Sequence, residues 1–92
     1  MNNPAPTAEA IGRWIAPNPH KPGPAEAWVL PAHVSVWALV TQLQLDGWDT
    51  VGVAADYELP VEAVEAASAY YQQHRIVIDA RIARNRAFFA AL

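Results

Sequence analysis

The 92-residue sequence predicts a mostly helical fold, a tri-helical helix-turn-helix bundle with short N-terminal β strands and a long C-terminal helix. Three observations favour it. Seven of the eight prolines lie in residues 1–31, apolar residues take a helical spacing from Ser35 onward, and residues 70–92 contain neither glycine nor proline. We therefore divide one domain into a proline-rich segment (1–34), a helix-turn-helix core (35–73) and a basic, apolar C-terminal helix (74–92).

Composition indicates an intracellular protein. The chain has no cysteine, although 53% of its residues are hydrophobic, and a secreted domain of this size usually needs disulfides or a metal. Residues 1–6 lack the basic and apolar regions of a signal peptide. No stretch approaches the roughly 20 apolar residues of a membrane span. We expect a cytoplasmic protein with no membrane segment.

The proline-rich segment predicts two short strands. Arg13–Ala16 and Ala27–Leu30 are apolar runs, separated by the helix-breaking stretch 17–24. They could pair as a hairpin, or each could add to the sheet of a partner. An isolated hairpin is marginally stable in water, so its tryptophans must pack on something.

Three helices are predicted next. Ser35 is a fair N-cap for a first helix that ends near Gly47, and Asp49-Thr50 begins a second that ends near Tyr57. Pro60 suits the first turn of a third helix, which extends to about Gln73. The expected buried face of this third helix holds Val61, Val64, Ala67, Ser68 and Tyr71, and its other face holds Glu62, Ala63, Glu65, Ala66, Ala69, Gln72 and Gln73. The helix could run on past His74 or bend there.

A helix-turn-helix unit raises the question of DNA binding. Duplex binding usually rests on about 6–10 phosphate contacts. This chain has six lysines and arginines in total, and four of them lie in the C-terminal segment 74–92 rather than on the third helix. Glutamates on the third helix would repel phosphates. Gln72, Gln73 and Arg75 are the candidate DNA contacts, within a dimer or a complex with a basic partner. The other interpretation is a structural scaffold.

The C-terminal helix carries a seam of mostly apolar residues. Tyr71, Arg75, Ile78, Ile82, Asn85, Phe89 and Leu92 follow a 4-3 spacing typical of helices that pair. Residues 1–73 hold eight acidic and two basic residues, whereas residues 74–92 hold four arginines and one aspartate. The stripe could fold back onto the chain's own core, or a partner could cover it, either a second copy or a different protein. The candidate partner-binding residues are Ile78, Arg81, Ile82, Arg84, Asn85, Arg86, Phe88 and Phe89.

The pattern of polar residues predicts no catalytic residue, metal site or cofactor, and the chain is not expected to be an enzyme. His20, His33 and His74 lie far apart without ligand spacing, and no glycine-rich phosphate loop is present. Ser35 and Ser68 lack the surroundings of a nucleophile.

Several segments together resemble one bacterial family, called domain of unknown function 433. The resemblance covers about residues 11–85 and is carried by Val34–Val40, Asp46–Asp49, Val53–Tyr57, Leu59–Ala67, Ala69–Tyr71, His74 and Ile78–Ile82. The strongest part is the Asp-Tyr, Leu-Pro and Ala-Tyr-Tyr framework. Family members usually carry Gly-Thr-Arg-(Ile/Val)-Pro-Val where this sequence has Pro31–Val36, so His33 stands in the place of an arginine.

The resemblance implies a homeodomain-like helical bundle with a short strand region before it. It also implies the antitoxin of a type II toxin–antitoxin pair, which binds and inhibits a PIN-like ribonuclease toxin, with operator binding by the complex. In that function Arg81, Arg84 and Arg86 would occupy the acidic site of the toxin, and Ile78, Ile82, Phe88 and Phe89 would be apolar anchors. The alternatives are a homodimeric helix-turn-helix transcriptional regulator and a structural or adaptor dimer.

Overall fold

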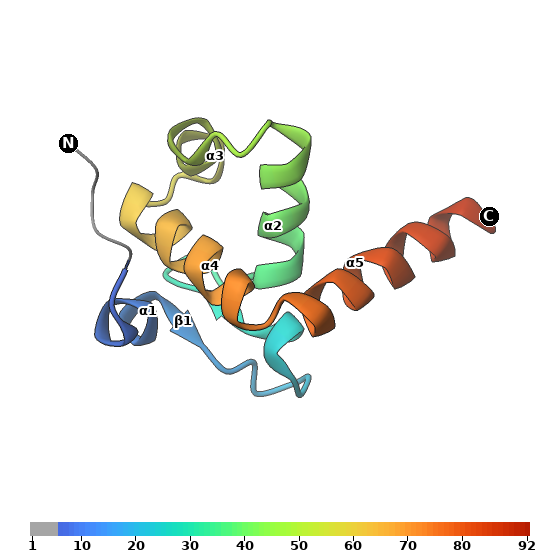
Figure 1. The fold of residues 1–92 in the computed structure, drawn as a ribbon, viewed down its shortest axis with the longest axis horizontal. Coiled ribbons are helices and arrows are strands. Elements are labelled where there is room, and N and C mark those ends of the chain that lie inside the picture. The colour runs from blue at the N-terminus through green and yellow to red at the C-terminus, as the bar shows by residue number, and fades with distance from the viewer. Residues whose placement is uncertain (1–5) are drawn as a thin grey trace.

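The mostly helical prediction is confirmed by a computed structural model, which describes residues 6–92 (Figure 1). Residues 1–5 lie outside the described residues. They belong to the predicted 1–34 segment and to the N-terminal stretch that lacks the features of a signal peptide. In chain order the elements are α1 (Ala8–Trp14), β1 (Ile15–Ala16), the 3-10 turn η1 (Pro24–Glu26), β2 (Trp28–Val29), β3 (Val34–Ser35), α2 (Val36–Leu45), α3 (Thr50–Tyr57), α4 (Val61–Gln73) and α5 (Arg75–Ala90). Among these residues, no helix combines the length and apolar character needed to cross a membrane.

The N-terminal third contains the helix α1, which the proline-rich composition did not predict. Arg13 and Trp14, predicted as strand, belong to α1. The Thr7 side chain caps this helix by accepting a hydrogen bond from the Ala10 backbone N–H at 3.1 Å. Ile11 is buried, and α1 packs against α4. A side-chain cap and one buried apolar residue therefore suffice for two turns of helix here.

The small sheet is antiparallel and has one strand more than predicted. The strand order is β1-β2-β3, with Ile15 opposite Val29 and Val29 opposite Val34. Val29 of the central strand is fully buried and lies in the hydrophobic core. An isolated hairpin would be marginally stable, and the third strand together with packing on the helices stabilises this sheet.

The predicted helices 35–47, 50–57 and 60–73 correspond to α2, α3 and α4. Asp49 caps α3 by accepting a hydrogen bond from the Gly52 N–H at 3.0 Å. Glu58, with φ of 56°, ends α3 in a left-handed conformation, two residues before Pro60, which is the N-cap of α4 and not part of its first turn. Ser35 precedes α2 as predicted, but its side chain makes no capping hydrogen bond. The helices are thus observed, whereas their use as a helix-turn-helix unit stays a prediction.

The buried face of α4 is wider than predicted. Ala63 and Ala66, expected on the outer face, are both fully buried. The reason is that α4 packs against α1 as well as against α2, α3 and α5. Trp48 and Ser68 add a polar contact to this core, because the indole Nε1 donates to Ser68 Oγ at 3.0 Å.

The chain bends between α4 and α5. His74 has φ of −126° and ψ of 32°, which interrupts the helix, and α5 begins at the next residue. The sequence left open whether the helix runs on or bends near His74, and it bends. From there α5 crosses the body and then projects away from every other element (Figure 1). The molecule is elongated along this direction, with extents of 44 × 28 × 23 Å.

Candidate partner-binding surface

The first half of α5 belongs to the chain's own core. Ile78 is 0% exposed and Ile82 is 6% exposed, and α5 packs against α2, α4 and η1. The predicted partner-binding surface is therefore corrected at these two residues. The apolar seam of the sequence is covered internally as far as Ile82, because the body supplies enough apolar surface to reach that point.

Arg81 is likewise occupied within the chain. Its Nε donates to Glu26 Oε1 at 2.7 Å, and both side chains are largely buried. The guanidinium also lies over the ring of Trp37, 4.1 Å from its centroid, in a cation–π contact. A carboxylate 55 residues earlier in this chain therefore binds the Nε of Arg81, and the prediction that Arg81 reaches the carboxylates of a toxin stays a prediction.

Tyr71 fastens the start of α5 to α4. Its hydroxyl donates a hydrogen bond to Asp79 Oδ1 at 2.7 Å. Burial raises the pKa of the Tyr71 phenol above its ordinary value of 10.0, and the hydrogen bond to Asp79 raises this pKa further, while Arg75 acts in the opposite direction. Asp79, the acidic residue of the C-terminal segment, is therefore directed toward the body.

This contact predicts a pH-dependent contribution to stability. The folded state holds the Tyr71 proton more tightly than the unfolded state, so the contribution is fully present below pH about 10 and is lost as pH rises through the folded pKa. We expect Tyr71→Phe to lower the free energy of unfolding by about 1 kcal/mol at pH 7. Urea unfolding between pH 7 and 11 should show a smaller alkaline loss of stability in the variant. Equal alkaline losses in both proteins would contradict this role.

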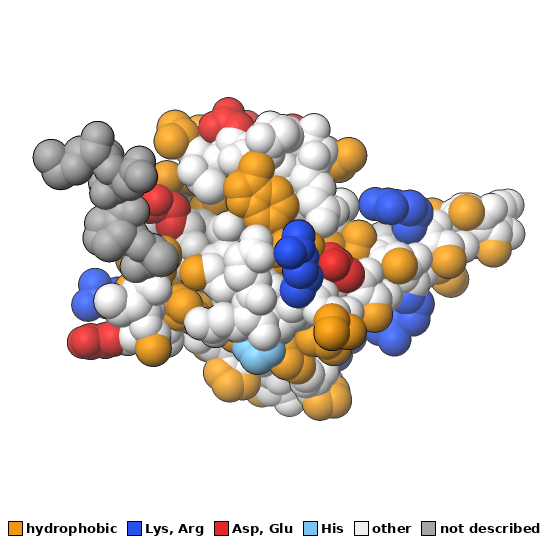
Figure 2. Space-filling view, viewed as in Figure 1, with side chains coloured by type: hydrophobic (Ala, Val, Ile, Leu, Met, Phe, Trp, Pro, Cys, Tyr) orange, Lys and Arg blue, Asp and Glu red, His pale blue; other side chains and the backbone are white. Residues whose placement is uncertain are grey.

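Residues 83–92 comprise the last turns of α5, which ends at Ala90, and the two residues that follow it; we call this segment the α5 tip. Phe88 is 61% exposed and Phe89 is 62% exposed, and their rings form an edge-to-face pair at 5.4 Å. Arg84 and Arg86 are exposed and Asn85 is half-buried. Figure 2 shows Lys or Arg side chains on both sides of the projecting helix, with hydrophobic side chains between and beyond them. The predicted residues from Arg84 to Phe89 thus lie on one unsupported segment.

The α5 tip has an unbalanced positive charge. No aspartate or glutamate occurs between Ala80 and Leu92. Across residues 6–92 the structure records a single ion pair, which joins Arg81 to Glu26. Arg84 and Arg86 are consequently not neutralised by carboxylates of the described chain. An exposed aromatic pair beside two such arginines has the composition of an interface centre.

The candidate DNA contacts lie at the bend between α4 and α5. Gln72, Gln73 and Arg75 are all exposed there. Beside them lie two exposed apolar residues, Ile76, which is 89% exposed, and Val77, which is 42% exposed. The sequence analysis did not single out this pair, but the absence of both residues from the 4-3 seam could have indicated their exposure. The Arg75 guanidinium lies 5.7 Å from the ring centroid of Tyr71. The structure therefore gathers the three polar candidates into one surface with apolar neighbours.

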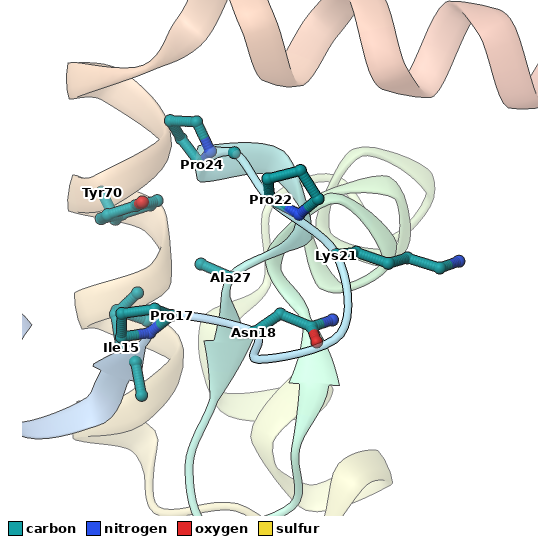
Figure 3. A pocket seen from close by; sticks show the side chains of 10 residues that line it. Ile15, Pro17, Asn18, Lys21, Pro22, Pro24, Ala27 and Tyr70 are labelled. Atoms are coloured by element: carbon teal, nitrogen blue, oxygen red, sulfur yellow. The ribbon is translucent and has the colours of Figure 1, made fainter.

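Two open pockets flank the loop 17–23. The first, of about 320 Å³, lies between this loop and α4 and is lined by Ile15, Pro17, Pro24, Ala27 and Tyr70 (Figure 3). Burial raises the pKa of the Tyr70 phenol, and the Tyr70 ring stacks with His74 at 4.4 Å. Lys21 also lines this pocket, and the end of its side chain extends away from Tyr70 (Figure 3). The second pocket, of about 380 Å³, contains Trp28 and Arg81.

Comparison with known proteins adds no relative. No protein-family model, no curated protein and no solved structure matches this chain.

Proposed function

We propose that the chain is the antitoxin of a type II toxin–antitoxin pair and that it inhibits a PIN-like ribonuclease through the α5 tip. The observation that carries the proposal is the exposure of Phe88 and Phe89 beside Arg84 and Arg86 on a projecting helix. The identity of the partner rests on the family resemblance described above. The geometry of the tip favours a protein partner with an acidic cleft.

The proposed inhibition is electrostatic and steric. PIN-like ribonucleases hold Mg²⁺ in a cluster of carboxylates, as the resemblance implies, and guanidinium groups of Arg84 and Arg86 would take the place of the cation. Phe88 and Phe89 would supply apolar anchors, each contributing about 1.5–3 kcal/mol if fully buried. Arg81 lies outside the α5 tip and its Nε is bound by Glu26, so the proposal assigns it no role in this contact. Asn85 would set the rotation of the helix in the cleft.

Co-expression with the product of the adjacent gene tests the proposal. The expected result is that the neighbour arrests growth when expressed alone, and that the full chain restores growth and co-elutes with it in size-exclusion chromatography. A chain ending at residue 83 keeps Ile78 and Ile82 in the core and should fold without restoring growth. Deleting residues 75–92 would be a poorer test, because it removes core residues. Growth rescue by the chain ending at residue 83 would refute the mechanism.

A second function, operator binding by the antitoxin–toxin complex, is favoured by the joint exposure of Gln72, Gln73 and Arg75 at one end of α4. Glu62 is exposed on the same helix and opposes phosphate contacts, so the cations would have to come from the partner or a second copy. A gel-shift assay with the upstream promoter should show binding by the complex and none by the isolated chain. Sequence-specific binding by the isolated chain would favour a stand-alone regulator instead.

A further inference from the structure

We propose that the pocket between β2, the loop 17–23 and α5 binds the phosphate and base of a nucleotide. The proposal is independent of the α5 tip. It rests on the hydrogen-bonding state of Arg81, on the donors around it and on the aromatic walls of the pocket. The pocket is open to solvent and has a volume of about 380 Å³.

The first observation is that the guanidinium of Arg81 is fixed in position while its two Nη groups remain available as donors. Glu26 fixes Nε of Arg81 at 2.7 Å, and Trp37 supports the guanidinium plane at 4.1 Å. Among residues 6–92 the structure records no hydrogen bond from the two Nη groups, and no buried side-chain nitrogen or oxygen lacks a partner. The Nη groups therefore reach the solvent in the pocket that Arg81 lines. A guanidinium fork held in this way is prepared for an oxyanion.

The second observation is an excess of donors. Lys21, His20 and His33 line the same pocket, and each carries at least one N–H donor in either protonation state near neutral pH. The carboxylate among the lining residues is Glu26, which already accepts from Arg81. All three side chains are exposed, so solvent satisfies these donors in the free protein, and a ligand rich in acceptors is the kind that can replace that solvent. A phosphate, with its three terminal oxygens, meets this requirement.

The third observation is the aromatic surface. Trp28 has two imidazoles near it, with the His33 ring edge-on at 4.7 Å and the His20 ring tilted at 6.1 Å between ring centroids. Trp28 and His33 are partly or fully exposed. Flat aromatic side chains beside cations are the usual platform on which single-stranded bases stack. The phosphate would therefore approach Arg81 and Lys21 while the base stacks near Trp28.

Indole N–H signals of ¹⁵N-labelled protein provide the test, because the chain has four tryptophans. Titration with adenosine monophosphate should shift the signals of Trp28 and Trp37, and leave those of Trp14 and Trp48 unchanged as internal controls. Adenosine alone and inorganic phosphate alone should each bind more weakly than the nucleotide. A short oligonucleotide that binds more tightly than the monophosphate identifies a nucleic acid strand as the source, whereas weaker binding identifies a free nucleotide.

Substitutions distinguish the pocket from general charge attraction. Arg81→Lys should weaken nucleotide binding about tenfold or more, because lysine cannot present a fork. Lys21→Gln, at an exposed residue outside the core, should weaken it about two- to fivefold, and it keeps the test decisive if Arg81→Lys fails to fold. Arg84→Gln removes an exposed arginine of the same helix that does not line the pocket, and should have no effect. Equal binding of adenosine and its monophosphate, or equal effects of Lys21→Gln and Arg84→Gln, would overturn the proposal.

Discussion

Replacing Ile78 with alanine is expected to lower the free energy of unfolding by about 2–5 kcal/mol. Ile78 is 0% exposed and belongs to the hydrophobic core, so the substitution removes buried methyl and methylene groups and leaves a cavity. Domains of this size are commonly stable by only about 5–15 kcal/mol. The variant should therefore show a large shift in its urea midpoint.

The matched control lies two residues earlier in the same helix. Ile76 is 89% exposed, so Ile76→Ala should change the free energy of unfolding by no more than about 0.5 kcal/mol. Both variants remove the same atoms and alter helix propensity equally. Similar destabilisation by the two substitutions would contradict the burial pattern of α5.

Combined substitution of Phe88 and Phe89 with alanine is expected to weaken partner binding about thirtyfold or more, since truncating an interface centre commonly costs at least 2 kcal/mol. Adding Arg84→Glu and Arg86→Glu should abolish the complex, because like charges would then face the acidic cleft. Thermal unfolding of the isolated chain should change little, because these side chains make few contacts with the body. Pull-down of the co-expressed neighbour or calorimetry gives the measurement.

The matched control again removes exposed apolar groups, but far from the tip. Leu45 is 74% exposed and Val51 is 68% exposed, on α2 and α3. Their combined replacement with alanine should leave the partner affinity unchanged. A loss of binding equal to that of the Phe88 and Phe89 variant would move the interface away from the α5 tip.

Local signals in the sequence were enough to predict α2, α3 and α4. Spaced apolar residues, the Asp49 cap and Pro60 define these helices, and such features depend only on neighbours along the chain. The helix α1 was missed because the surrounding prolines dominated the interpretation, although Thr7 supplies a cap. The wider buried face of α4 was missed for the same reason, since α1 packs against α4 in addition to α2, α3 and α5.

The candidate partner-binding surface was predicted only in part. The apolar seam of α5 has one continuous spacing in the sequence, but in the structure its first part is buried and its last part is exposed. Tyr71, Ile78, Ile82 and Phe89 share one spacing, yet burial stops after Ile82. Where burial stops depends on how far the body extends beneath the helix, which no local pattern encodes. The contact of Arg81 with Glu26 joins residues 55 positions apart, and the charge of Arg81 alone gave no sign of it.

Amide hydrogen exchange reports the local free energy of opening at each residue and so measures how far along α5 the core extends. In the isolated chain, we expect strong protection of the amides of Ile78 and Ile82 and rapid exchange from Arg86 to Ala90. The neighbour's product should then protect the segment from Arg86 to Ala90. Strong protection of that segment in the isolated monomer, or rapid exchange at Ile78, would contradict the division of α5 into a core half and a binding half.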